Sequence, residues 1–124
     1  MELLIISVNV LAAIATIILG LFGWLRPDFT MDLLGLKSTD ETGLGKSEIR
    51  AASGALWVGV GVASLVLFSP TAFLMLAAVW GGGAIGRLTA IVVDGANKGQ
   101  PVVFFIVEAA FAVVLVALNL PALT

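Results

Sequence analysis

The chain has 124 residues, of which 60% are hydrophobic and only 11% are charged, and its net charge is −2. A soluble domain typically carries ~25% charged residues, so this composition predicts a membrane protein, with one domain over residues 1–124. Cysteine and histidine are absent, which excludes disulfides, thiolate metal sites and imidazole acid–base chemistry. There is no basic tract for nucleic acid, and we expect no metal and no cofactor.

Four apolar runs define the predicted fold. Each is close to the ~20 residues that span the ~30 Å hydrocarbon core of a bilayer. Backbone groups in lipid must be paired internally, and no run alternates with period two, so helices are favoured over barrel strands. We predict an all-α, integral membrane, four-transmembrane-helix up-down bundle. The helices are expected over about residues 3–25, 48–68, 71–93 and 102–120.

The connections between these runs contain helix start and stop signals. Residues 27–36 (PDFTMDLLGL) follow the first run and predict a short interfacial helix that ends at Gly35. Ser47 is a predicted N-cap for the second transmembrane helix. Residues 69–71 leave room only for a tight hairpin between the second and third helices.

The basic residues predict an orientation in the membrane. They flank the loops 26–47 and 94–101, whereas the opposite side of the predicted bundle has none. The positive-inside rule then places both loops in the cytoplasm and both termini on the non-cytoplasmic side of the cell (inner) membrane. Met1-Glu2 provides no basic n-region, so the first run is interpreted as a retained helix and not as a cleaved signal peptide.

Arg87 is the unusual residue of the third run. A charge in such a segment costs ~2.5–3.5 kcal/mol on insertion scales, so Arg87 requires a partner. It precedes Asp94 by seven residues, and Glu108 follows Pro101 by seven residues, which places each side chain ~10 Å from the cytoplasmic end of its helix. The equal depth and opposite charge predict an intramembrane salt bridge between Arg87 and Glu108.

Glu48, Arg50 and Asp94 lie one or two turns nearer the cytoplasm and extend this pair to a predicted ladder of five charged residues. The functional interpretation is a binding site for an anionic group. The structural alternative is a set of ion pairs that fix the order of the helices, with Arg50 reaching toward the interface.

Trp57 and Trp80 fall near the middle of their predicted helices, away from the interfacial belts that tryptophan prefers. Each is seven residues from the arginine of its own helix. We expect the two indoles to face each other and to bound a cavity whose floor is Arg50, Arg87 and Glu108. The alternative is packing, with each indole N–H bonded to a carbonyl or water.

Two glycine-containing strings resemble nucleotide-binding motifs. Residues 81–86 (GGGAIG) match G-x-G-x-x-G, but no strand precedes them, so Gly82-xxx-Gly86 is interpreted as a close-packing face between membrane helices. Residues 43–47 (GLGKS) resemble the end of a P-loop. They precede a membrane helix, and we interpret them as helix capping.

The combination of Glu48-x-Arg50, Gly86-Arg87, Asp94-Gly95 and Glu108 resembles a bacterial family of small four-helix membrane proteins known as domain of unknown function 4345. The resemblance covers nearly the whole chain. It implies a four-helix integral membrane protein and carries no established activity, so no catalytic role is transferred to any residue.

The residues leave three functions open. The preferred one is a binding or accessory protein, with a buried charged site for a hydrophobic anionic ligand or a partner membrane subunit. The others are a membrane-embedded enzyme acting on a lipid or isoprenoid with a carboxylate as acid/base, and proton- or ion-coupled transport. The absence of a nucleophile–base pair argues against an enzyme. The expected partners are the bilayer, a lipid-like ligand, and a second copy or a larger complex.

Overall fold

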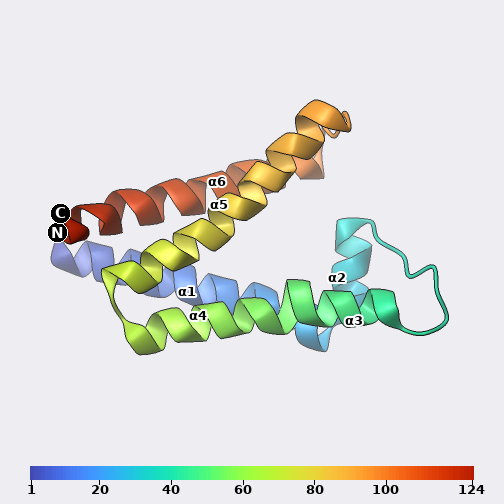
Figure 1. Cartoon of the computed structure of the whole chain (residues 1–124), viewed down its shortest axis with the longest axis horizontal. Coiled ribbons are helices and arrows are strands. Elements are labelled where there is room, and N and C mark those ends of the chain that lie inside the picture. The colour runs from blue at the N-terminus through green and yellow to red at the C-terminus, as the bar shows by residue number, and fades with distance from the viewer. The chain divides into compact units, whose positions relative to one another are not determined.

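The computed structural model describes residues 1–124 and contains helices, turns and no strands (Figure 1). Four helical segments are long and apolar enough to cross a membrane, which confirms the predicted fold class. The elements are α1 (Glu2–Leu25), α2 (Pro27–Leu34), α3 (Leu44–Arg50), η1 (Ala51–Ala55), α4 (Leu56–Leu67), α5 (Pro70–Val93), α6 (Gln100–Asn119) and η2 (Leu120–Leu123). The short helix predicted after the first span is α2, and it ends at Gly35, which has φ +69°.

The chain divides into two compact units. One consists of residues 1–9 and 67–124, and the other of residues 10–66. Helix α1 contributes its first turns to the former and the rest of its length to the latter.

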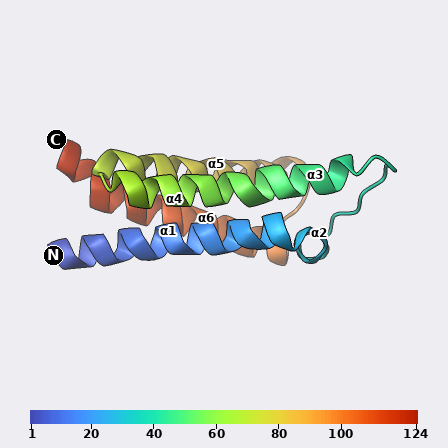
Figure 2. The ribbon, with the colours of Figure 1, turned by 90° about the horizontal axis from the view of Figure 1, so that it is seen from below.

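The unit of residues 1–9 and 67–124 is built on the α5–α6 hairpin, whose two helices run along each other in Figures 1 and 2. Ser69 caps α5, because its hydroxyl oxygen accepts the N–H of Ala72 at 3.2 Å. The start of α1 joins this unit through two buried amides. Asn9 and Asn119 donate to each other's side-chain oxygens at 2.8 and 2.9 Å. Since both amides are satisfied, this contact fixes the end of α6 against the beginning of α1.

The unit of residues 10–66 places α1 beside the continuous helix formed by α3, η1 and α4 (Figures 1 and 2). Glycines make this contact close. A Cβ on Gly20 would lie 2.7 Å from the carbonyl oxygen of Gly54, and one on Gly61 would lie 2.9 Å from that of Ala13. Small residues that let backbones approach are the usual means of packing helices in membranes.

The second membrane-length helix begins at Leu44, earlier than predicted, and the assignment of Ser47 as its N-cap is wrong. Gly43 precedes the helix with φ +81°, and the N–H of Ser47 already donates to the Gly43 carbonyl at 2.9 Å as part of the first turn. The glycine can adopt this left-handed conformation without the steric cost that a side chain would add.

The predicted close-packing face at Gly82 and Gly86 is not used within the chain. A Cβ at either position would meet nothing within 4 Å. Helix packing through glycine occurs instead at Gly20, Gly23, Gly54 and Gly61, where an added Cβ would collide with the backbone of the neighbouring helix.

Candidate functional site

The structure brings Arg87 of α5 and Glu108 of α6 together. Nε of Arg87 lies 3.5 Å from Oε1 of Glu108, and the two side chains are 36% and 12% exposed. Both residues stand on membrane-length helices. No other charged group pairs with this guanidinium, so its remaining N–H donors face no protein anion.

The carboxylate of Glu108 occupies space that a glycine provides. A Cβ on Gly83 would lie 3.1 Å from Oε2 of Glu108 and 3.5 Å from Oε1, so a larger residue there would require the carboxylate to shift slightly. Oε2 is buried and has no hydrogen-bond partner within the protein. A buried carboxylate oxygen without a hydrogen-bond donor is energetically costly.

Aromatic rings lie on both sides of this pair along α6. Phe104, four residues before Glu108, lies under the Arg87 guanidinium, whose Cζ is 5.0 Å from the ring centroid. Phe111, three residues after Glu108, stacks on Trp80 of α5 with centroids 4.3 Å apart and planes 18° apart. The charged pair is therefore flanked along the helix direction by apolar rings, one of which contacts the guanidinium.

Trp80 itself is only 2% exposed. Its stacking with Phe111 accounts for one ring face. Trp57 belongs to the unit of residues 10–66, where it packs against Gly20 of α1. A Cβ added to Gly20 would lie 2.9 Å from the Cβ of Trp57. The expectation that Trp57 and Trp80 bound one cavity above Arg50, Arg87 and Glu108 stays a prediction.

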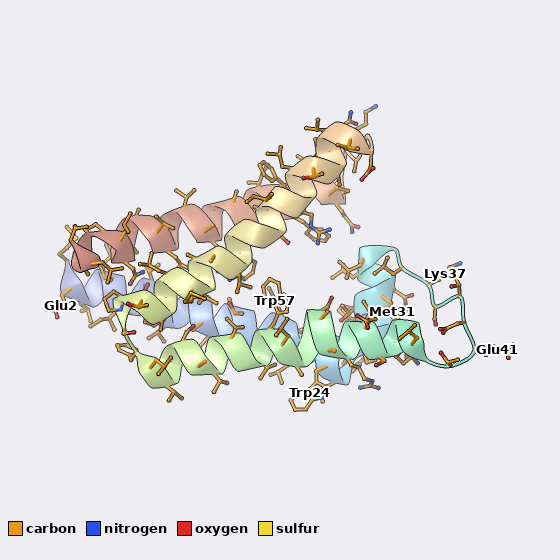
Figure 3. All side chains as sticks on the ribbon, in the orientation of Figure 1. Glu2, Trp24, Met31, Lys37, Glu41 and Trp57 are labelled. Atoms are coloured by element: carbon orange, nitrogen blue, oxygen red, sulfur yellow. The ribbon has the colours of Figure 1, made fainter.

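Arg50 binds the end of α1 and forms no ion pair. Its Nη1 donates to the carbonyl oxygen of Trp24, one of the last carbonyls of α1, which have no partner within that helix. An arginine at a helix C-terminus also interacts favourably with the helix dipole. In Figure 3 the side chains of Trp24 and Trp57 lie on opposite sides of the helix formed by α3, η1 and α4.

Glu48 and Asp94 are exposed and take part in no ion pair, and Arg50 is exposed as well. The structure therefore contains no ion pair at these three residues, and their role as candidates for ligand binding stays a prediction. For Arg50 one reason is local: residues 51–55 form a π-helical turn, which carries an extra residue and takes Arg50 off the face expected from regular α-helical spacing.

Three features of the site were missed by reasoning from the sequence. Phe104 and Phe111 stand four residues before and three after Glu108, a spacing that identifies them as its neighbours on one helix face. The contact of Arg50 with Trp24 had no signal in the sequence, because it joins residues 26 positions apart through a backbone carbonyl.

The fold and these contacts define a class: an all-helical protein with four membrane-length helices and a charged pair between the last two. The chain belongs to the family described as "Domain of unknown function (DUF4345)", which it matches over residues 6–119. No curated protein and no solved structure matches the chain.

Proposed function

We propose that this is a multi-pass membrane protein that binds an amphiphile with an anionic head group, and that Arg87 recognises the head group. One observation carries the proposal: the guanidinium of Arg87, on a membrane-length helix, is about a third exposed and has Glu108 as its only ionic partner. A guanidinium has five N–H donors in a planar fork, and the approach through Nε leaves the Nη donors for a ligand.

The chemistry of the surroundings supports an amphiphile. The Nη groups can donate two parallel hydrogen bonds to a carboxylate or phosphate. Glu108 orients the guanidinium through the contact of its Oε1 with Nε of Arg87. Phe104 and Phe111 are both partly exposed beside the charged pair and offer apolar surface for the hydrocarbon part.

The proposed location is the cell (inner) membrane, with both termini on the non-cytoplasmic side. The four apolar helices support a membrane location, and the concentration of Lys and Arg around residues 26–50 and at Lys98 supports the orientation. In that location Arg87 and Glu108 form an intramembrane salt bridge within reach of the cytoplasmic interface, where the head group of a lipid would lie.

Native mass spectrometry of the protein extracted in mild detergent tests this function. We expect a bound amphiphile with an acidic or phosphate group in the wild type, and its loss in Arg87→Gln. Arg26→Gln is the matched control, because it removes the same charge from an exposed position and should retain the ligand.

Other outcomes of this measurement would contradict the proposal. A co-purifying protein subunit that is lost in Arg87→Gln would assign the site to a partner and make the protein an accessory subunit. Equal retention of an amphiphile by the wild type and Arg87→Gln would remove Arg87 from recognition.

A further inference from the structure

A pocket of about 480 Å³ opens in the unit of residues 10–66, where α1 ends and α3 begins. Its lining combines two cations, a hydroxyl, an indole and two small residues: Lys46, Arg50, Ser47, Trp24, Gly43 and Ala51. No residue of α5 or α6 lines this pocket, so it is separate from the site at Arg87.

The residues that line this pocket carry two positive charges and no negative one. Lys46 and Arg50 each carry one positive charge, and the only anion paired with either of them is Asp28, whose Oδ1 lies 2.9 Å from Nζ of Lys46. Asp28 is 77% exposed and Lys46 is 44% exposed, so this pair is open to solvent and contributes little to stability. A stronger anion can therefore compete for Lys46.

The donors converge from one helix. Lys46 and Arg50 are four residues apart on the segment that begins at Leu44, so they lie on the same side of it, and Ser47 lines the same pocket. Arg50 is held in place by its hydrogen bond from Nη1 to the Trp24 carbonyl, which leaves its other N–H groups available. Gly43 and Ala51 have little or no side chain, so the space beside Lys46, Ser47 and Arg50 stays open.

We infer that this pocket binds a phosphate group, with Lys46 and Arg50 as its cationic donors and Ser47 as a hydroxyl donor. Two cations and a hydroxyl around an open volume form the donor set that phosphate oxygens accept from. Trp24 is 43% exposed at the end of a membrane-length helix, the position at which an indole meets lipid head groups. Both an anionic phospholipid and a free phosphate offer the required chemistry.

Binding to the detergent-solubilised full chain, measured by titration calorimetry, tests this inference with three ligands. They are short-chain phosphatidylglycerol below its micellar concentration, glycerol phosphate and inorganic phosphate. Saturable binding of phosphatidylglycerol alone assigns the pocket to a lipid head group, whereas binding of all three with similar affinity assigns it to free phosphate. Binding of none of them overturns the inference.

Two variants locate the binding. Lys46→Gln removes an exposed cation, and we expect it to weaken phosphate binding about tenfold, as loss of one charge-assisted contact should. Ser47→Asp leaves both cations in place but adds a negative charge to the pocket, and it should abolish binding. Lys37→Gln, in the exposed loop before α3, is the matched control and should bind as the wild type does.

The two variants keep the test independent of folding and of the site at Arg87. Both substituted residues lie at the surface, and the helical circular dichroism and thermal midpoint of each variant should equal those of the wild type. Unchanged affinity in Lys46→Gln and Ser47→Asp, with ligand still bound, would place the phosphate elsewhere. Arg87→Gln should leave this affinity unchanged, so failure here and failure of the proposed amphiphile site are separate results.

Discussion

Glu108 holds one carboxylate oxygen 3.5 Å from Nε of Arg87 and keeps the other buried without a hydrogen-bond partner. The pair is therefore incomplete on both sides: the guanidinium has donors to spare, and the carboxylate lacks one. An ion pair whose only role was to hold α5 against α6 would be expected to satisfy its buried oxygen within the protein. The N–H donors that Arg87 has to spare are those that the proposed function assigns to a ligand.

The first prediction concerns the energetic coupling of these two residues. Arg87→Met should reduce the free energy of unfolding by about 1–3 kcal/mol, because it leaves the Glu108 carboxylate nearly buried and without a counter-charge. Glu108→Leu together with Arg87→Met should recover much of that loss. Unfolding in mixed micelles, followed by circular dichroism, measures the cycle. Strict additivity of the two single substitutions would show that the residues are not coupled.

The amides of Asn9 and Asn119 provide a second prediction. Asn119→Leu removes both bonds of the reciprocal pair and leaves the Asn9 amide buried without a partner. We expect a loss of about 1–2 kcal/mol. The double variant Asn9→Leu with Asn119→Leu should be more stable than Asn119→Leu alone, since no unpaired amide remains. A double variant less stable than either single one would contradict this account.

Glycine packing provides a third prediction with an internal control. Gly20→Ala should destabilise the unit of residues 10–66 by about 1–3 kcal/mol, because its Cβ would lie 2.7 Å from backbone atoms of Gly54 and Val58. In Gly59→Ala the new Cβ would have no neighbour within 4 Å. This substitution should be neutral, or should stabilise the protein by up to about 1 kcal/mol because alanine has the higher helix propensity. Thermal unfolding of the two variants tests the difference, and equal midpoints would refute the close contact.

The orientation in the membrane is the fourth prediction. The chain has no cysteine, so a single cysteine can be placed at Thr39, Asn97 or Thr124 without background labelling. In intact cells an impermeant thiol reagent should label the cysteine at position 124 and spare those at positions 39 and 97. Labelling at position 97 without labelling at position 124 would reverse the orientation.

Much of the fold could be predicted from the sequence because its signals are local. Spanning length, Pro27, Pro70 and the glycine at position 35 identify helices and their ends without any tertiary information. The start of the second span was missed because Gly43 and Ser47 compete as caps, and the sequence does not reveal which of them adopts the left-handed conformation.

The site was harder to predict because side-chain contacts depend on local departures from ideal geometry. Arg87 and Glu108 could be matched by counting residues from regular helix ends. Arg50 could not, since a π-helical turn directly after it shifts the register and its partner is a backbone carbonyl. The exposed Gly82 and Gly86 show the same limit: a small-xxx-small pattern predicts that a helix can pack closely, but not which helix it meets.

The most direct test of the central claim is a titration of the solubilised protein with a brominated long-chain fatty acid, followed by quenching of tryptophan emission. Trp80 stacks on Phe111 beside the charged pair, so bromine in a bound chain should quench it. We predict that the acid binds the wild type and Arg26→Gln about tenfold or more tightly than Arg87→Gln, while the uncharged methyl ester does not distinguish the three proteins. Equal affinity of the acid for the wild type and Arg87→Gln would contradict the claim that Arg87 recognises an anionic head group.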